Sequence, residues 1–263
     1  MQNKDNTYAL ITGASSGIGL AFAERLAQLG HNLFLVSNQK AILEEKGAKL
    51  QKNYSIEVLT LELDLAEENS AQNLFQYAQN QSIEVDILIN NAGVFTFSEV
   101  VDTAPDKITQ ILYLHVFTTT LLCRLFAQQM LKSGRQCYIL NMSSLAAWMA
   151  VPSIALYSST KAYLRHFSRT MHEELYHSNV SLTVACPGGV ATNLYGASNK
   201  ILKTGLKWKV LSTPQKSANC ALKAMFKKKK QCIGGSFINK IMQLFAPHLP
   251  HFVLQIIKKK CNA

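Results

Sequence analysis

The hydrophobic and polar positions of the chain alternate between short apolar runs and longer amphipathic stretches. Apolar runs predict six buried strands, at 8–12, 32–36, 56–61, 85–89, 137–141 and 180–185. Helical periodicity predicts the helices between them, at 20–29, 41–52, 67–79, 105–131 and 155–176. Strands that alternate with helices are typical of βαβ units. The sequence therefore predicts an α/β fold in which helices cover both faces of a parallel sheet.

Polar or glycine-rich segments directly follow four of the predicted strands. They are Gly13–Gly19, Asn90–Gly93, Ser143–Ser144 and Pro187–Gly188. In an open parallel sheet, ligands bind outside the carboxyl ends of the strands. We therefore expect these four segments, although distant in the chain, to meet at one edge of the sheet.

The first of these segments, Gly13–Gly19, has the spacing Gly-x-x-x-Gly-x-Gly between a strand and a helix. Glycines let the backbone approach a ligand closely, and a helix N-terminus presents free N–H groups and a positive dipole to a phosphate. The segment lacks the Gly-Lys-Ser/Thr ending of a nucleoside-triphosphate loop, which favours a dinucleotide pyrophosphate. The alternative is a tight strand-to-helix turn that binds no ligand.

Tyr157 and Lys161 lie four residues apart at the start of the last long helix, a spacing that places both on one face. A free phenol has a pKa of about 10, and a nearby ammonium lowers it. Ser144 follows the fifth strand, so we expect its hydroxyl to bind the same substrate oxygen that Tyr157 protonates. The spacing Tyr-x-x-x-Lys alone is a common accident, and the alternative is a surface Tyr and Lys.

The composition allows a large core and gives no sign of disorder. The 263 residues are 48% hydrophobic and 16% charged. The six cysteines show neither Cys-x-x-Cys pairing nor metal-ligand spacing, which is typical of reduced thiols in a cytosolic protein. The first residues form neither a basic n-region nor an apolar h-region, so no secretory signal is expected. His172 and His177 are five residues apart and do not share a helix face, so no metal site is expected.

The net charge of +11 is concentrated near the C-terminus. Residues 200–263 hold fourteen lysines and no arginine, aspartate or glutamate, whereas the first 199 residues carry a net charge of −3. This distribution suggests an anionic partner such as a membrane face or an acidic carrier. The alternative is a solvated surface that aids solubility. No recognition motif or interleaved aromatic residues accompany the lysines, so nucleic-acid binding is not expected.

Taken together, several segments resemble the short-chain dehydrogenase/reductase family. They are TGASSGIG at 12–19, Asp64-Leu65, NNAG at 90–93, Ser144, Tyr157-x-x-x-Lys161, and Pro187-Gly188 with Thr192. The resemblance covers residues 7 to about 195, and the combination is far more specific than any one segment. It implies a Rossmann-like, doubly wound parallel sheet of about seven strands, and since the sequence shows no repeat, linker or second domain, we expect a single catalytic domain over 1–263. It also implies hydride transfer between a nicotinamide cofactor and a carbonyl or alcohol.

The resemblance also implies residue roles. The catalytic residues would be Ser144, Tyr157 and Lys161, and the last two would also hold the nicotinamide ribose. The pyrophosphate would be held by Gly13, Ser15, Gly17, Ile18 and Gly19. The adenosine would be bound by Asp64, Leu65, Asn91, Ala92 and Gly93. The nicotinamide amide would be lined by Pro187, Gly188, Val190 and Thr192.

One departure from the family pattern lies in the long helix after NNAG. The family usually has an Asn there, which supports a water linking the catalytic lysine to solvent. This chain has His115 instead. We expect His115 either to act as a proton relay, since a histidine pKa lies near neutrality, or to be a partly buried histidine with no special role.

The second departure lies at the end of the second strand, where an acidic residue would bind the ribose 2′-OH and select NAD. The sequence there is Ser37-Asn38-Gln39-Lys40, without a carboxylate. Small polar groups and Lys40 leave room for a 2′-phosphate, although Asn38 replaces the Arg of many NADP-using relatives and Ser16 is not basic. We expect NADP(H), with Ser16 and Asn38 among the residues that bind it, and NAD is the alternative.

The segment 194–263 leaves the shared pattern and is expected to form a short, basic and apolar helical extension that covers the substrate. Ile241–Ile257 has no charged residue, but Pro247 and Pro250 break it, so a transmembrane helix is not expected. Residues 237–260 are expected either to contact a membrane surface or to pack on the body or on another subunit. Long-chain and steroid-type reductases of the family carry similar extensions, which implies a hydrophobic carbonyl substrate such as a 3-oxoacyl thioester.

The sequence thus predicts a cytoplasmic, homo-oligomeric oxidoreductase, either free or at the inner face of a membrane. The alternative is a dinucleotide-binding or scaffold protein with little turnover at a membrane surface. The complete set of Ser144, Tyr157 and Lys161 argues against the scaffold, and the missing Asn argues for it.

Overall fold

Seven parallel strands form one sheet in this computed structural model, which describes residues 7–192, 194, 199–207, 211–234 and the single positions 243, 250 and 254. The strands are β1 (Thr7–Thr12), β2 (Asn32–Ser37), β3 (Val58–Glu62), β4 (Glu84–Asn90), β5 (Cys137–Met142), β6 (Val180–Ala185) and β7 (Gln231–Cys232). Their order is β3-β2-β1-β4-β5-β6-β7, and all neighbours are parallel. The strand order reverses between β1 and β4, which is where such sheets bind ligands.

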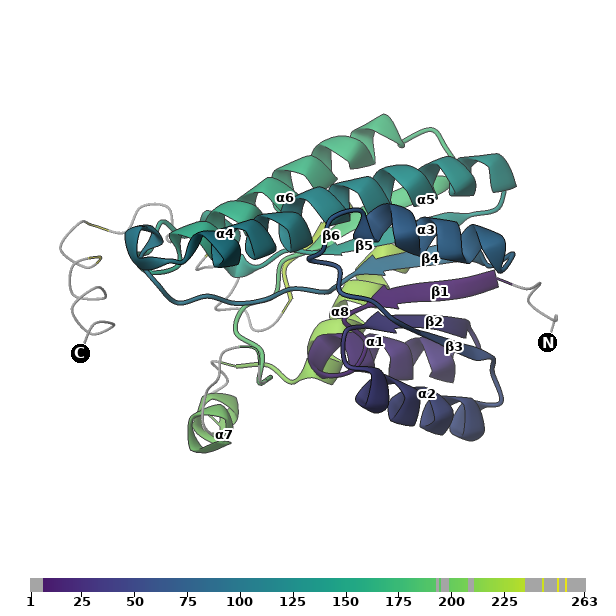
Figure 1. Ribbon diagram of the computed structural model, residues 1–263, viewed down its shortest axis with the longest axis horizontal. Coiled ribbons are helices and arrows are strands. Elements are labelled where there is room, and N and C mark those ends of the chain that lie inside the picture. Colours follow the sequence, from purple (N-terminus) through teal and green to yellow (C-terminus); the bar gives the residue numbers. More distant parts are fainter. Residues whose placement is uncertain are drawn as a thin grey trace.

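The helices form two layers, one on each face of the sheet (Figure 1). One layer holds α1 (Gly17–Gln28), α2 (Lys40–Tyr54) and α8 (Pro214–Phe226). The other holds α3 (Ser70–Asn80), α4 (Pro105–Leu112), α5 (Thr119–Ser133) and α6 (Ala155–Glu174). The short helix α7 (Asn199–Lys207) lies apart from both layers. The doubly wound α/β fold expected from the sequence is confirmed.

The two faces of the sheet explain why the central strands read as continuous apolar runs. Successive side chains of a strand point to opposite faces. In β1, Tyr8 and Leu10 belong to the core under α3 and α5, whereas Ala9 and Ile11 belong to the core under α1 and α8. Because both faces are covered by helices, the interior positions of β1 are apolar on both sides.

Local hydrogen bonds account for a helix that begins later than the periodicity predicts. Helix α3 begins at Ser70, whereas the pattern predicts residue 67. The Ala66 N–H donates to Asp64 Oδ1 at 2.9 Å, and the Ser70 hydroxyl donates to the Leu65 carbonyl at 3.1 Å. These bonds hold residues 64–69 in a turn, and Asn69 at its end has a positive φ of 62°.

The long helix predicted over 105–131 is interrupted by a π-helical segment, η2 (Tyr113–Thr118), between α4 and α5. By length and composition alone, Pro105–Ser133 is apolar enough to cross a membrane, but half of the apolar window is buried inside the protein. Leu122, Phe126 and Met130 pack into the core beneath α5, as in the core helix of a soluble domain. Single π turns inside helices occur frequently at functional sites.

The C-terminal part of the chain is less of an extension than expected. Residues 211–234 belong to the body, because α8 packs against α1 and β7 pairs with β6. Strand β7 was not among the six predicted strands, because two residues are too few to form an apolar run. The stretch 237–260, expected at a membrane or subunit contact, lies outside the described residues apart from positions 243, 250 and 254.

Candidate active site

The carboxyl ends of the strands border a cavity of about 450 Å³. Segments that follow β1, β2, β3, β4, β5 and β6 all contribute to its wall, as does the start of α6. The structure thus brings together most of the residues singled out from the sequence: Gly13, Ser15, Ser16, Gly17, Ile18, Asn38, Asp64, Leu65, Asn91, Ala92, Gly93, Ser144, Tyr157, Lys161, Pro187, Gly188, Val190 and Thr192. Gly19 and His115 lie behind this wall. Ser37 and Gln39, from the segment expected to select the cofactor, also line the cavity, and further lining residues without an expected role include Val94, Leu114, Met142 and Leu194.

Two glycines of the turn, Gly13 and Gly19, are packed too closely for a side chain. Gly13 and Gly17 have φ values of 65° and 57°, in the region that favours glycine. A Cβ on Gly19 would lie 2.1 Å from the Gly13 carbonyl oxygen, and a Cβ on Gly13 would lie 2.9 Å from Ala92 Cα. At its glycine positions the turn therefore presents backbone at the start of α1, where the first N–H groups have no intrahelical partner. Such a surface fits a pyrophosphate.

Thr12, at the end of β1, fastens this turn to the segment that follows β4. Its hydroxyl oxygen accepts from the N–H groups of Asn91 (2.9 Å) and Ala92 (3.0 Å). In return, Asn91 Nδ2 donates to the carbonyl of Thr12 at 3.0 Å and to that of Gly13 at 3.3 Å. The two segments at the reversal of strand order are thus held as one unit. The sequence analysis included Thr12 in the segment TGASSGIG but gave it no role, although a hydroxyl at the last strand position before a glycine turn was a usable signal.

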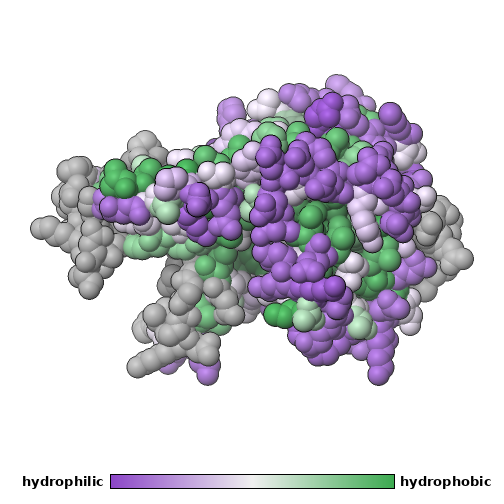
Figure 2. Space-filling view, viewed as in Figure 1, coloured by the Kyte–Doolittle hydropathy of each residue, from purple (hydrophilic) through white to green (hydrophobic). Residues whose placement is uncertain are grey.

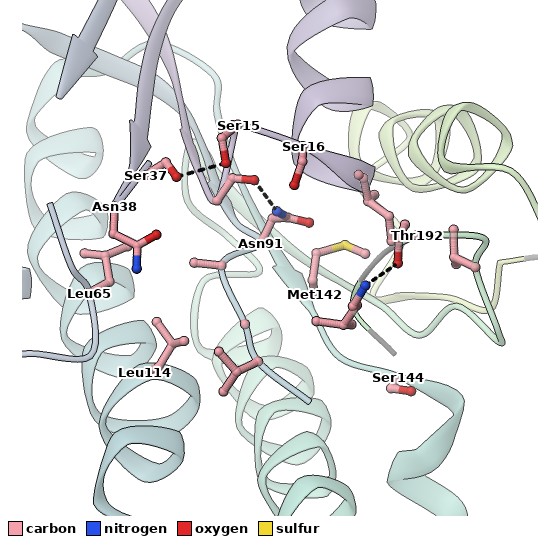
Figure 3. A pocket seen from close by; sticks show the side chains of 18 of the residues that line it. Ser15, Ser16, Ser37, Asn38, Leu65, Asn91, Leu114, Met142, Ser144 and Thr192 are labelled. Carbon is pink, nitrogen blue, oxygen red and sulfur yellow. Dashed lines mark hydrogen bonds between the residues drawn. The ribbon is translucent and has the colours of Figure 1, made fainter. Parts of the chain in front are cut away.

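One end of the cavity is lined by hydroxyl and amide groups (Figure 3). The Ser37 hydroxyl donates to Ser15 Oγ at 3.0 Å, and Ser15 donates to Gln39 Oε1 at 3.0 Å. The Asn38 side-chain amide donates to Asp64 Oδ2 at 3.2 Å. Figure 3 shows Asn91 in the middle of the cavity and Ser144 at the opposite end. This polar end suits the adenosine half of a dinucleotide.

Lys40, which follows this polar end, extends along the surface. Its Nζ lies 4.0 Å from Glu62 Oε2, and both side chains are more than half exposed. An exposed ion pair of this kind contributes little to stability. Lys40 is therefore held only weakly by Glu62.

At the opposite end, Ser144 and Tyr157 are both nearly buried, with 8% and 5% of their surface exposed. Ser144 caps the short helix η3 (Leu145–Trp148), where its Oγ accepts from the Ala146 N–H at 3.1 Å. Because this bond uses an oxygen lone pair, the hydroxyl proton is available to a substrate oxygen. Phe95 packs edge-on against the Tyr157 ring, with the ring centres 4.9 Å apart.

Lys161 places a buried ammonium beside the Tyr157 ring. Its Nζ lies 5.7 Å from the ring centre and donates to the Met142 carbonyl at 3.1 Å. Burial lowers the pKa of Lys161 from 10.5 to about 8. The backbone of this residue is also held, because Ser143 Oγ donates to the Lys161 carbonyl at 2.7 Å. The ammonium is thus positioned by β5, whose last residue is Met142.

His115, in η2, is fully buried and bonded through both ring nitrogens. The Val94 N–H donates to Nε2 at 3.0 Å, so Nε2 carries no proton. The ring proton is therefore on Nδ1, which lies 2.9 Å from Thr160 Oγ1 and donates to it. Thr160 in turn donates to the Tyr157 carbonyl at 2.8 Å. His115 thus joins the segment after β4 to the helix that carries Tyr157.

The electrostatics of His115 differ from the expectation. Burial, and then the nearby charge of Lys161, lower the pKa of His115 well below its usual 6.5. The pKa near neutrality on which the relay hypothesis rested is therefore wrong, because the ring has no contact with solvent. The structure favours a neutral imidazole that fixes geometry, and a relay role stays a prediction.

Comparison with known proteins gives a family for this arrangement. The family model for the short chain dehydrogenase matches residues 7–202. A diacetyl reductase [(S)-acetoin forming] of Staphylococcus epidermidis is 28% identical over 188 residues, which cover 71% of this chain and 72% of the relative. A very-long-chain 3-oxoacyl-CoA reductase of Anas platyrhynchos is 29% identical over 191 residues, 71% of this chain and 61% of the relative.

Solved structures agree with this family. A short-chain dehydrogenase from Sphingobium yanoikuyae in complex with NADPH has a TM-score of 0.78 and 26% identity, and the match covers 86% of this chain and 87% of that one. A 7beta-hydroxysteroid dehydrogenase has a TM-score of 0.84, with 98% and 97% of the two chains covered. Its identity is 18%, so that likeness shows the fold alone.

Lys161→Met tests whether the buried ammonium costs stability. The folded-state pKa of about 8 lies below the usual 10.5, so the folded protein binds this proton less tightly than the unfolded chain does. Below pH 8 the charge therefore destabilises the fold, by roughly 3 kcal/mol. We expect Lys161→Met to unfold at higher urea than the wild type at pH 7, with the difference shrinking as the pH rises from 8 towards 10.5. The exposed Lys132→Met is the matched control, and a less stable Lys161→Met protein at pH 7 would contradict this reading.

His115→Ala and His115→Asn separate a positioning role from a proton relay. Removing the imidazole leaves the Val94 N–H and the Thr160 hydroxyl without this partner, which costs about 1–3 kcal/mol. We expect turnover of the alanine variant to be roughly tenfold lower than that of the wild type. The factor should be the same at every pH from 5 to 9, because the substitution damages the geometry and not a proton transfer. The asparagine variant should be intermediate. A loss that varies with pH would support the relay, and full turnover in both variants would exclude both roles.

Proposed function

This chain belongs to the short-chain dehydrogenase family of oxidoreductases, and on that basis we propose that it is an NADP(H)-dependent reductase of a hydrophobic carbonyl compound. One observation carries the proposal. Ser144, Tyr157 and Lys161 line the same cavity as the glycine turn, although they come from different parts of the chain. A proton donor and a cradle for a dinucleotide pyrophosphate thus share one site.

The chain's own residues supply binding and proton transfer. A bound nicotinamide would supply the hydride that reduces the substrate carbon. Ser144 and Tyr157 would hydrogen-bond the substrate oxygen, and negative charge develops on that oxygen as the carbon is reduced. Tyr157 then transfers its phenolic proton to the oxygen, so that the carbonyl becomes an alcohol. Donors that are already in place when the charge appears lower the barrier.

Lys161 would assist this transfer electrostatically. After the transfer, Tyr157 is a phenolate, and the ammonium close to its ring stabilises that negative charge. The burial of both groups strengthens the interaction, because little water screens it. His115, through Thr160, is linked to the backbone of Tyr157, and the Met142 carbonyl binds the ammonium of Lys161.

Apolar side chains in the cavity wall support a hydrophobic substrate. Val94, Leu114, Met142, Val190 and Leu194 line the cavity. Phe97 stacks on Phe95 and is 49% exposed. Apolar walls with a few convergent polar groups are typical of pockets that bind apolar small molecules. The diacetyl and 3-oxoacyl-CoA reductases among the relatives also support a ketone, and we propose a 3-oxoacyl or related compound.

Cofactor choice rests on the polar end of the cavity. Ser15, Ser37, Asn38 and Gln39 supply uncharged donors there, and no carboxylate follows β2 within three residues. Lys40, the first residue of α2, directly follows Gln39 and is held only weakly by Glu62. These groups tolerate a 2′-phosphate, and the relative from Sphingobium yanoikuyae was solved with NADPH.

We also propose that the protein is a homo-oligomer. Large apolar side chains are exposed on the helices of one layer, among them Leu112, Phe117 and Tyr163. Figure 2 shows hydrophobic surface at the protruding end that carries α4, whereas the opposite half of this view is mostly hydrophilic. Exposed apolar surface that gathers in this way favours a protein contact.

Tyr157→Phe tests the proposed function. The substitution removes the phenolic proton donor and keeps the ring that packs against Phe95. We expect the turnover of a panel of ketones, measured as the rate of NADPH oxidation, to fall by about a thousandfold or more. Cofactor affinity, measured by NADPH fluorescence, should stay within about threefold of the wild type.

Tyr163→Phe is the matched control, because Tyr163 lies on the same helix with an exposed ring. It should keep wild-type turnover. An active Tyr157→Phe protein would refute the assignment. A wild type that binds NADPH but reduces no ketone, aldehyde or 3-oxoacyl thioester would favour the scaffold function instead.

Asn38→Asp tests the cofactor choice. For the wild type we expect a KM at least about tenfold lower for NADPH than for NADH. A carboxylate at position 38 would repel a 2′-phosphate and accept from a 2′-hydroxyl, so Asn38→Asp should raise the KM for NADPH and lower that for NADH. Asn53→Asp adds the same charge on exposed α2 and should change neither KM. A wild type that prefers NADH would contradict the proposal.

A further inference from the structure

Two thiols meet outside the active site, between α8 and β7. The Sγ atoms of Cys220 and Cys232 are 3.2 Å apart, and both cysteines are free. Cys232 is 8% exposed and also donates to the Cys220 carbonyl at 3.6 Å. Cys220 is only partly buried. One member of the pair is therefore within reach of solvent, and the other is packed behind it.

The strand that carries Cys232 supports the nicotinamide end of the cavity from one side. β7 pairs with the end of β6, and the Cys186 N–H donates to the Cys232 carbonyl at 2.7 Å. Gly234, two residues further, lies against Pro187, with 3.7 Å between a Cβ built on Gly234 and Pro187 Cα. Pro187 and Gly188 line the cavity. The position of β7 therefore affects where this loop begins.

The helix that carries Cys220 supports the same loop from the other side. Ser212, just before α8, donates from its N–H to the Gly189 carbonyl at 2.9 Å and accepts from the Ala191 N–H at 2.9 Å. Its hydroxyl lies 2.8 Å from that of Ser217 in α8. The loop 186–192 is thus held between two supports, and each support carries one of the two thiols.

We propose that Cys220 and Cys232 form a redox-active dithiol, whose oxidation by a peroxide to a disulfide links α8 to β7 and fixes the loop 186–192 at the active site. Disulfide formation needs only the geometry of the two thiols. Its effect on the loop rests on the proposed nicotinamide function.

The chemistry proceeds in two balanced steps. In the first step the Cys220 thiolate attacks one peroxide oxygen, so that an S–O bond forms and the O–O bond breaks. The leaving oxygen takes up a proton. The sulfur is thereby oxidised to a sulfenic acid, and the peroxide is reduced. The Cys232 sulfur then attacks the Cys220 sulfur. The S–S bond forms, the S–O bond breaks, and the hydroxyl leaves as water with the Cys232 proton. An external dithiol reverses the reaction by exchange.

The roles of the two thiols follow from their surroundings. Burial, and then the contact with Cys220, raise the pKa of Cys232 to about 12, which disfavours its thiolate as the first nucleophile. Cys220 is the more accessible to a peroxide. A disulfide has an S–S bond of about 2.05 Å, so the sulfurs must approach by about 1 Å. That movement draws the two supports of the loop together.

The experiment uses the full-length protein, reduced and then treated with hydrogen peroxide before the peroxide is removed. Peptide mass mapping should find a loss of two hydrogens and a crosslink between the peptides that carry residues 220 and 232. The melting temperature should rise by on the order of 5 °C, because the link constrains the unfolded chain. The Kd for NADPH should fall about threefold, because a fixed loop needs less ordering on binding. Dithiothreitol should reverse all three changes.

Cys220→Ser and Cys232→Ser should each lack the response, and Cys220→Ser is the milder change because that side chain is only partly buried. Cys137→Ser, at the far end of β5, should keep it. A disulfide between other cysteines, or sulfinic acid without a crosslink, would overturn the dithiol. A mapped 220–232 disulfide that leaves the Kd unchanged would overturn its effect on the loop. Reduced wild type that does not bind NADPH would refute the proposed function, while the mapping would still decide on the dithiol.

Discussion

A buried ammonium is the constraint on which the site depends. Lys161 is almost inaccessible to water, and burial lowers its pKa to about 8. The position is unfavourable for a charge, and it is compensated only in part by the Met142 carbonyl. A structure keeps such a group where the chemistry needs a positive charge that water does not screen. The neighbouring elements can be understood as the means of holding that charge against the Tyr157 ring.

Most of this holding is done by backbone groups and by small hydroxyl residues. Thr12 joins the ends of β1 and β4, Ser143 fixes the carbonyl of Lys161, and Thr160 links His115 to the helix of Tyr157. Apart from the Thr160–Tyr157 bond, which lies within α6, each of these bonds joins elements that are separate in sequence. The long side chain of Lys161 is thus positioned by the edge of the sheet. The short side chains of Thr12, Ser143 and Thr160 hold the surrounding backbone in place.

The sequence was sufficient for the strands, their parallel arrangement and the meeting of glycine turn, Ser144 and Tyr157 at one edge. These features depend on local periodicity and on a topological rule, which are both visible in one sequence. The state of His115 was not predictable, because its pKa depends on complete burial beside Lys161 and its tautomer depends on Val94 and Thr160. Strand β7 was missed because it forms only by pairing with β6. The role of Thr12 was missed because its partners lie about eighty residues away.

The π-helical turn η2 has a consequence for the whole helix in which it lies. An α-helix advances by about 100° per residue, and a single π turn accommodates one extra residue without breaking the helix. The residues before and after η2 are therefore out of phase with each other. This offset lets α5 direct Leu122 and Phe126 into the core, while Leu112 at the end of α4 remains on the surface. If the same residues formed a regular α-helix without the π turn, one half would be rotated relative to the other by about 100°, roughly a quarter of a turn. The π turn therefore keeps the apolar side of α5 on the core, and losing it without a change in length would turn part of that side towards solvent.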